Sequence, residues 1–140
     1  MNNIRIEKTL HALLLAFIIL LLAILFPTRA NGFEVNMDLA PHIINMSGNM
    51  ETFVIHTNIA YGIVDPHSVT LNGDENYIYG WKMDSLGNFD AIILLSDIAD
   101  TLVTGEDNVF LLKGLTWEGE PFWAVDELLV IEKALHTGKL

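Results

Sequence analysis

Hydrophobic and polar positions divide the chain into two parts with different patterns. Residues 10–26 form a continuous apolar run that only His11 interrupts. From residue 31 onward, short runs of alternating apolar and polar residues are separated by Gly, Asn, Asp and Pro. Alternation with a period of two is typical of half-buried strands, and short strands between turn signals are typical of a β-sandwich.

The second part therefore predicts an all-β fold of about seven strands. The predicted strands are His42–Met46, Glu51–Thr57, Ser68–Leu71, Tyr77–Met83, Asn88–Leu95, Val109–Thr116 and Phe122–Ile131. Their number and spacing favour an antiparallel, immunoglobulin-like β-sandwich. Between them, Ser96–Thr104 predicts one short helical turn, capped by Ser96 or Asp97, with Ile98 and Leu102 at helical spacing and Gly105 closing it.

The last two predicted strands form a hairpin around Glu118-Gly119-Glu120-Pro121. Alternation gives each strand two faces, and the face with Phe110 and Phe122 is the predicted core because Lys113 and Glu127 lie on the other. The outward apolar side chains are then Leu111, Leu115, Trp117, Trp123 and Leu129. A patch of this kind exceeds what soluble monomers usually expose, so it predicts a surface for a partner protein, a second copy or the bilayer. The alternative is that a loop or the residues around Phe33–Leu39 cover it.

The first thirty residues have the layout of an export signal. Basic Arg5 and Lys8 precede the apolar run, and Thr28 and Ala30 occupy positions −3 and −1 of a cleavage after Ala30. The run is long for a signal peptide and approaches the length that spans a membrane, so an uncleaved anchor is the alternative. Both forms place residues 31–140 outside the cytoplasmic membrane, because the basic end stays inside. The predicted organisation is a signal peptide or hydrophobic anchor helix at 1–30, a sandwich at 31–132 and a mobile tail at 133–140.

Charge and cysteine content narrow the range of partners and chemistry. Residues 31–140 contain 17 acidic and four basic residues, a net charge of −13. Such an acidic surface repels phosphate backbones and anionic lipid, which argues against nucleic acid and against peripheral lipid binding. The chain has no cysteine, which excludes disulfides, thiolate metal sites and a cysteine nucleophile.

A series of turn and core residues covers most of the second part. It runs through Asp65-Pro66, Val69-Thr70-Leu71-Asn72-Gly73, Gly87-Asn88-Phe89-Asp90-Ala91, Gly114, Gly119-Glu120-Pro121-Phe122, Asp126 and Val130-Ile131. In this order the residues resemble an immunoglobulin-like accessory module of prokaryotic secreted and surface proteins. The resemblance implies a spacer, display or binding module without catalytic residues. The final hairpin departs from the pattern, since that module is polar outside where this chain carries Trp117 and Trp123.

Other residue groups suggest chemistry, each beside a structural alternative. Asp84, Asn88 and Asp90 supply oxygen ligands for Ca²⁺, but the loop is short and an Asp/Asn turn is the favoured interpretation. An aromatic stripe of Tyr77, Tyr79 and Trp81 suggests stacking on sugar rings, but one face of this strand must be core, so a covered stripe is the favoured interpretation. Asn45 begins an Asn-Met-Ser glycosylation triplet. Asp126 is interpreted as a polar residue that bonds a neighbouring turn.

No motif for catalysis or for a cofactor is present in the sequence. The histidines His42, His56, His67 and His136 form no local metal-binding pair, so we expect scattered surface histidines and no metal. There is no Gly-x-Ser-x-Gly elbow and no Gly-rich phosphate loop before a helix. The predicted function is an exported, non-enzymatic interaction or structural module of the cell envelope. It binds a protein partner or itself through the hairpin face, with a carbohydrate-binding module as the alternative.

Overall fold

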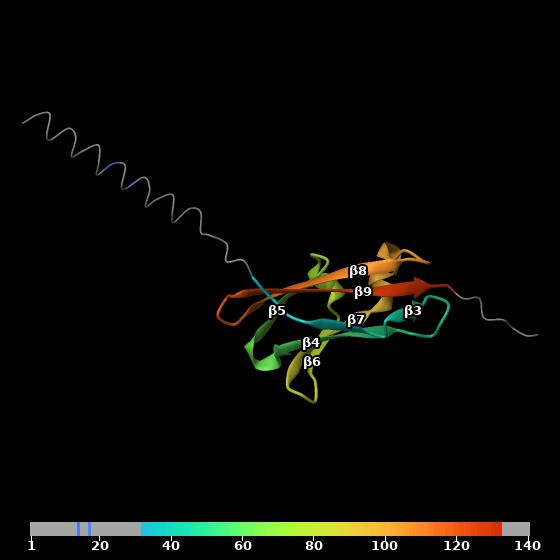
Figure 1. The fold of residues 1–140 in the computed structure, drawn as a ribbon, viewed down its shortest axis with the longest axis horizontal. Helices are drawn as coiled ribbons and strands as arrows, with labels where there is room; N and C mark the ends of the chain where they lie inside the picture. Colours follow the sequence, from blue (N-terminus) through green and yellow to red (C-terminus); the bar gives the residue numbers. More distant parts are fainter. Residues whose placement is uncertain (1–13, 15–16, 18–31, 133–140) are drawn as a thin grey trace, which may run out of the picture. The chain divides into compact units, whose positions relative to one another are not determined.

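The computed structural model describes Leu14, Phe17 and residues 32–132 (Figure 1). The chain divides between Ala30 and Asn31 into two units. The predicted signal peptide or anchor, its cleavage position and the predicted tail lie outside the described residues, apart from Leu14 and Phe17. No helix within the described residues has the length and apolar character to cross a bilayer.

The described part of the chain is mostly β-strand, with nine strands in two sheets. In chain order the strands are β1 (Phe33–Glu34), β2 (Met37–Ala40), β3 (Ile43–Asn45), β4 (Thr52–Ala60), β5 (Val64–Leu71), β6 (Gly80–Met83), β7 (Asn88–Leu94), β8 (Asp107–Thr116) and β9 (Pro121–Ile131). The prediction of about seven strands was too low. The segment before Met46 predicts one strand, but it forms three short strands that pair with different neighbours.

The two sheets form a sandwich-like arrangement. One sheet has the antiparallel order β2-β4-β7-β6, and the other has the order β1-β9-β8-β5, with β3 also paired to β9. Figure 1 shows β8 and β9 in one layer and β4 and β6 in the other. The first strands alternate between layers: β1 and β3 pair in parallel with β9, whereas β2 between them pairs with β4.

The core lies between the sheets and is built from the inward position of each alternating strand. Phe53 of β4 meets Phe110 of β8 edge-on across the core, with ring centroids 5.8 Å apart. Phe110 and Phe122 are buried, so the predicted core face of the hairpin is confirmed. All the buried apolar residues of the described chain lie between Val35 and Val130, so the second unit contains a complete core of its own.

A short helical segment joins β7 to β8, as predicted, but its cap differs. It consists of α2 (Leu95–Ile98) followed by the 3₁₀ turn η3 (Ala99–Thr101). The N-cap is Leu94, with no side-chain cap, because β7 runs directly into the helix and buries Leu95. The predicted caps Ser96 and Asp97 are therefore wrong, and their side chains bond each other at 3.1 Å.

Candidate functional site

The hairpin of β8 and β9 places the five predicted binding side chains on the face away from the core. Leu111 pairs with Val125, and Trp123 pairs with Lys113 two residues further along. Trp117 is 63% exposed and Leu115 40% exposed, whereas Leu111, Trp123 and Leu129 are half-buried by their neighbours. Alternation along the two strands therefore predicted this placement correctly, while binding at the face stays a prediction.

Three more apolar side chains extend this face beyond the predicted set. Val109 and Val125 belong to the hairpin itself and are 59% and 47% exposed. Ile43 comes from β3, where it pairs with Leu129 and is 52% exposed. We call the eight residues together the outer apolar face: Ile43, Val109, Leu111, Leu115, Trp117, Trp123, Val125 and Leu129. The alternation that found the first five also places the two valines here, but the position of Ile43 depends on a pairing distant in sequence.

Charged side chains lie within and beside the outer apolar face: Lys113 and Glu127 lie within it, and the exposed acids Glu34 and Asp107 pair with its members Trp123 and Leu129. Lys113 follows Leu111 by two residues on β8, and Glu127 follows Val125 by two residues on β9. Because β8 and β9 are antiparallel and Leu111 pairs with Val125, the two charges lie on opposite sides of the centre of the face. Both side chains are exposed.

A hollow of about 270 Å³ lies at the turn end of the outer apolar face. Its apolar walls come from Phe33, Ile63 and Trp117, and its polar wall from Glu118 and Glu120. The backbone N–H of Trp117 donates to the carbonyl of Ile63 at 2.9 Å, which fixes the end of β8 against the loop before β5. The hollow therefore adds shape and negative charge to one end of the face.

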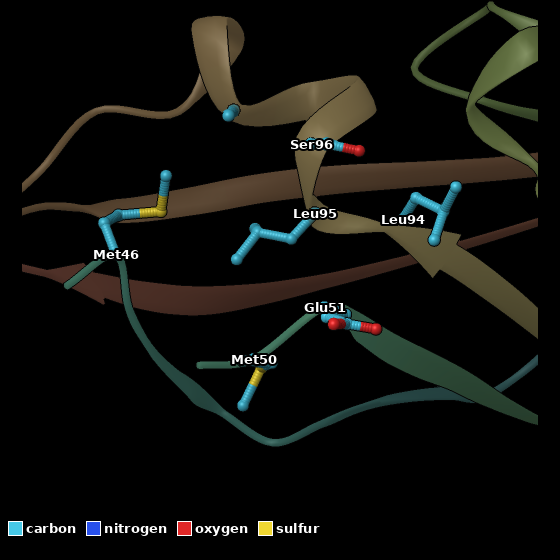
Figure 2. Close-up of a pocket in the computed structure, with 7 residues that line it drawn as sticks. Met46, Met50, Glu51, Leu94, Leu95 and Ser96 are labelled. Atoms are coloured by element: carbon cyan, nitrogen blue, oxygen red, sulfur yellow. The ribbon is translucent and has the colours of Figure 1, made fainter. Parts of the chain in front are cut away.

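A larger hollow of about 460 Å³ lies at the opposite corner of the domain, beside α2. Figure 2 shows Leu95 between the side chains of Met46 and Met50, with Glu51 and Ser96 nearby. Methionine side chains are flexible and fill irregular apolar space, so this hollow is best explained as the partly packed corner of the sandwich.

The calcium candidates do not form a common site. Asp84 accepts backbone N–H bonds from Leu86 at 2.8 Å and from Asn88 at 2.7 Å. The bond from Asn88, followed by others within the turn, lowers the pKa of the Asp84 carboxyl, although desolvation opposes this shift. Asp90 is buried on β7 and faces His56 instead. Asp84 and Asn88 thus form the Asp/Asn turn that the sequence analysis favoured.

Asp90 belongs to a row of charged residues across the outer side of the other sheet. The register aligns Asp38 of β2, His56 of β4, Asp90 of β7 and Lys82 of β6. His56 Nδ1 lies 3.0 Å from Asp90 Oδ1, and Lys82 Nζ lies 3.9 Å from Asp90 Oδ2. The Asp90 side chain is 1% exposed, and neither of its oxygens has a hydrogen-bond partner among the described residues. Lys82 supplies a nearby positive charge, and His56 adds one only when it is protonated, so this buried carboxylate is incompletely satisfied.

The three aromatic residues of the carbohydrate alternative do not share one exposed face. Tyr77 ends the 3₁₀ turn η2 (Glu75–Tyr77), so the predicted strand Tyr77–Met83 begins three residues late, at Gly80. The Asp74 side chain caps this turn by accepting the Asn76 N–H, which favours the turn over an extended strand at its residues. Tyr79 is 64% exposed, whereas Tyr77 and Trp81 pack partly against the core.

Trp81 instead lines a small hollow of about 210 Å³. Its ring meets His67 edge-on with centroids 5.1 Å apart, and Glu75 and Asn76 complete one wall. This hollow offers one aromatic edge and polar groups, without a flat aromatic platform.

Asn45, the glycosylation candidate, is half-buried in β3 and pairs with Ile131. Its side-chain oxygen accepts the Ser47 N–H at 3.2 Å. Glycosylation at Asn45 stays a prediction.

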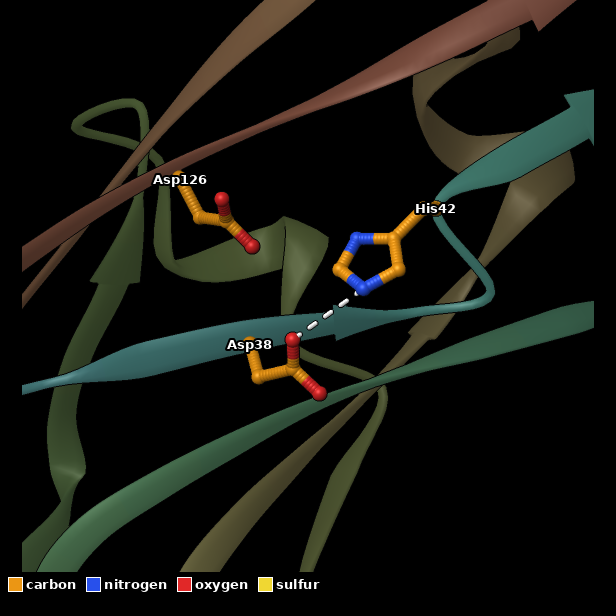
Figure 3. A group of neighbouring side chains, drawn as sticks. All are labelled: Asp38, His42 and Asp126. Carbon is orange, nitrogen blue, oxygen red and sulfur yellow. Dashed lines mark ion pairs between the residues drawn. The ribbon is translucent and has the colours of Figure 1, made fainter.

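A further group of converging side chains lies where the first strands cross between the sheets. Asp38, His42 and Asp126 each present one donor atom, and these atoms all lie within 4.8 Å of one another (Figure 3). His42 Nε2 lies 3.2 Å from Asp38 Oδ1. Asp126 Oδ2 accepts the backbone N–H of Leu39 at 2.9 Å, so Asp126 does bond the backbone, but its partner is strand β2 and not the predicted neighbouring turn.

The sequence analysis missed this group because its members are distant along the chain. Asp38 and His42 are four residues apart, but Asp126 lies 87 positions from Leu39, which it bonds. The spacing of Asp38 and His42 is the only local signal, and it does not predict convergence without the strand order.

No family model, curated protein or solved structure matches the chain.

Proposed function

We infer that the second unit is an exported, immunoglobulin-like interaction module that associates with a second copy of itself through the outer apolar face. The strand order supports the immunoglobulin-like assignment. A constant-type immunoglobulin sandwich has strands A-B-E-D in one sheet and C-F-G in the other. With β2 as strand A and β4 to β9 as strands B to G, one sheet has the order A-B-E-D, and the other has the order C-F-G with β1 and β3 as additional short strands beside G.

The observation that carries the proposal is the exposed apolar surface on the C-F-G sheet. Trp117 and the two valines of the hairpin are each close to half exposed or more, on a domain that is otherwise strongly acidic. Large exposed apolar patches on small domains mark interaction surfaces, and aromatic residues at their centre are typical anchors.

Size favours a small interface between two copies. β8 has 10 residues, β9 has 11 and β3 has three, so at about 3.3 Å per residue and about 4.8 Å per strand the face covers on the order of 400 Å². Stable interfaces bury roughly 800 Å² per partner, so a weak, concentration-dependent dimer is expected.

Charge complementarity favours a second copy as the occupant. Lys113 and Glu127 lie on opposite sides of the Leu111–Val125 centre. Consider a two-fold axis that lies in the plane of the face and is perpendicular to the line from Lys113 to Glu127. Rotation about this axis places Lys113 of each copy against Glu127 of the other copy. A two-fold interface must be self-complementary in this sense. The exposed acids elsewhere oppose association, so added salt should strengthen the dimer.

Export of the domain is part of the proposal and rests on the first thirty residues. The basic start and the apolar run are typical of a signal peptide or anchor. We propose a location at the cell surface or in the periplasm, with attachment to the membrane where the anchor is retained. The chain is proposed not to be an enzyme, in line with its resemblance to accessory modules.

The carbohydrate alternative has less support. Stacking on a sugar needs an exposed aromatic face, and of the three candidates only Tyr79 offers one. Loss of glycan binding in a Tyr79→Ala variant with an intact fold would favour this alternative over self-association.

Trp123→Glu is expected to dissociate the dimer. The change removes a large apolar contact from the face and adds a carboxylate opposite Lys113, which draws Lys113 away from Glu127 of the other copy. Residues 31–140 contain the complete core and can be produced alone. Light scattering over a dilution series should show a monomer–dimer equilibrium for this domain and only monomer for Trp123→Glu.

Tyr79→Glu provides the matched control, because Tyr79 is an exposed aromatic residue outside the outer apolar face. Its dimer should resemble that of the unmodified domain. A domain that stays monomeric at every concentration would contradict self-association. A second variant carries both Trp117→Ala and Trp123→Ala. If these changes unfold the domain and leave every association unchanged, the two tryptophans are core residues and the proposed interface is wrong.

A further inference from the structure

We propose that Asp38, His42 and Asp126 bind one divalent transition-metal ion, of which Zn²⁺ is the representative. This site lies apart from the outer apolar face and does not depend on the proposed function. The three side chains converge from β2, from the loop after it and from β9 (Figure 3).

The separation of the donor atoms fits a metal ion of this size. Ligand atoms at about 2.0–2.2 Å from a tetrahedral Zn²⁺ are roughly 3.3–3.6 Å from each other. His42 Nε2 and Asp38 Oδ1 are already 3.2 Å apart, and all three donors lie within 4.8 Å. Donors as far apart as 4.8 Å must approach each other by about 1 Å to share a tetrahedral ion. The side chains of His42 and Asp38 are 65% and 63% exposed, so both have room to turn.

The backbone holds the three donors in place from both sheets. Asp38 lies in β2, which pairs with β4. The carbonyl of His42 accepts the Leu129 N–H of β9 at 2.9 Å. Asp126 Oδ2 accepts the Leu39 N–H at 2.9 Å, which orients the carboxylate and leaves Oδ1 available as a ligand.

The donor chemistry favours a transition ion over Ca²⁺ or Mg²⁺. Imidazole nitrogen suits Zn²⁺ and its neighbours, whereas Ca²⁺ and Mg²⁺ prefer oxygen ligands alone. Within residues 32–132, neither Asp38 nor Asp126 forms an ion pair with a lysine or arginine. The two carboxylates concentrate negative charge at this point, which a divalent cation would neutralise.

Binding here would connect the two layers of the sandwich. Asp38 belongs to the β2-β4-β7-β6 sheet and Asp126 to the sheet of β9. An ion held between them ties β2 to β9, and so reinforces the side-chain bond that Asp126 already makes to the Leu39 N–H. The ion should therefore raise the midpoint of thermal unfolding as well as bind.

The test is calorimetric titration of Zn²⁺ into the full chain in a non-ionic detergent after treatment with a chelator. The expected result is one site per chain and a higher unfolding midpoint with Zn²⁺. Removal even of an outer-shell partner weakens metal binding by about 10–100-fold, so loss of a direct ligand in His42→Gln should weaken it at least as much. Asp126→Asn should do the same, while its amide oxygen still accepts the Leu39 N–H and keeps the fold.

His67→Gln is the matched control, because His67 is an exposed histidine outside this group. It should bind Zn²⁺ like the unmodified chain, and a large excess of Mg²⁺ should not compete. Equal Zn²⁺ binding by the unmodified chain and His42→Gln would overturn the proposal, as would displacement of Zn²⁺ by Mg²⁺. An unfolding midpoint that Zn²⁺ leaves unchanged would overturn the link between the sheets.

Discussion

Phe110→Ala is expected to lower the free energy of unfolding by about 3–5 kcal/mol, as large-to-small changes at buried aromatic positions do. Phe110 is 2% exposed, and its ring packs edge-on against Phe53 of the opposite sheet. Alanine leaves a cavity between the layers and removes that aromatic contact. Since domains of this size are stable by only about 5–15 kcal/mol, the variant should lose a large part of its stability in urea denaturation.

Val109→Ala is the control for this change. Val109 precedes Phe110 on the same strand but points outward and is 59% exposed. Its truncation should change the unfolding free energy by no more than about 0.5 kcal/mol when measured on the monomer. Equal losses for the two variants would mean that the two faces of β8 are wrongly assigned.

Gly114→Ala is expected to destabilise the domain by about 1–3 kcal/mol through overpacking. A Cβ at this position would lie 2.5 Å from Cζ of Phe122 and 3.2 Å from Cγ2 of Val69. Both neighbours are buried, so neither ring nor methyl can move aside without disturbing the core. Urea denaturation of the variant should show a lower midpoint with an unchanged slope.

Gly80→Ala provides the comparison, because a Cβ at Gly80 meets no heavy atom within 4 Å. This change should be neutral or slightly stabilising, since alanine restricts the unfolded chain more than glycine does. Adding Phe122→Leu to Gly114→Ala should recover part of the loss by clearing the space. A neutral Gly114→Ala would contradict the close approach of β8 to Phe122.

Local pattern was enough to predict the hairpin and its two faces. β8 and β9 are long, alternate regularly and are joined by a short turn, so Phe110 and Phe122 were correctly placed inside and Trp117 outside. The same alternation failed at Tyr77, because the Asp74 side chain caps a 3₁₀ turn that ends there, and the strand begins at Gly80.

Features that depend on the order of strands in the sheets could not be predicted from the sequence. The first strands alternate between sheets, and this crossing places Ile43 beside Leu129 and Asp38 near Asp126. The burial of Asp90 on the outer side of its sheet also depends on neighbours from two other strands. Such pairings join residues far apart in the chain, so a single sequence carries no periodic signal for them.

Exchange of the two charges on the outer apolar face tests self-association most directly. Lys113→Glu and Glu127→Lys each place like charges against one another in the two-fold dimer, so each variant alone should be monomeric in sedimentation experiments. An equimolar mixture should form a heterodimer, because the new glutamate of one variant then meets the new lysine of the other, and the unchanged Glu127 meets the unchanged Lys113. The double variant should likewise dimerise, since it restores both opposite-charge contacts.

If two copies associate in this two-fold arrangement, each single variant alone should be monomeric, and the equimolar mixture of the two variants should form dimers. Dimers that persist in both single variants, or a mixture that stays monomeric while the unmodified domain dimerises, would contradict it.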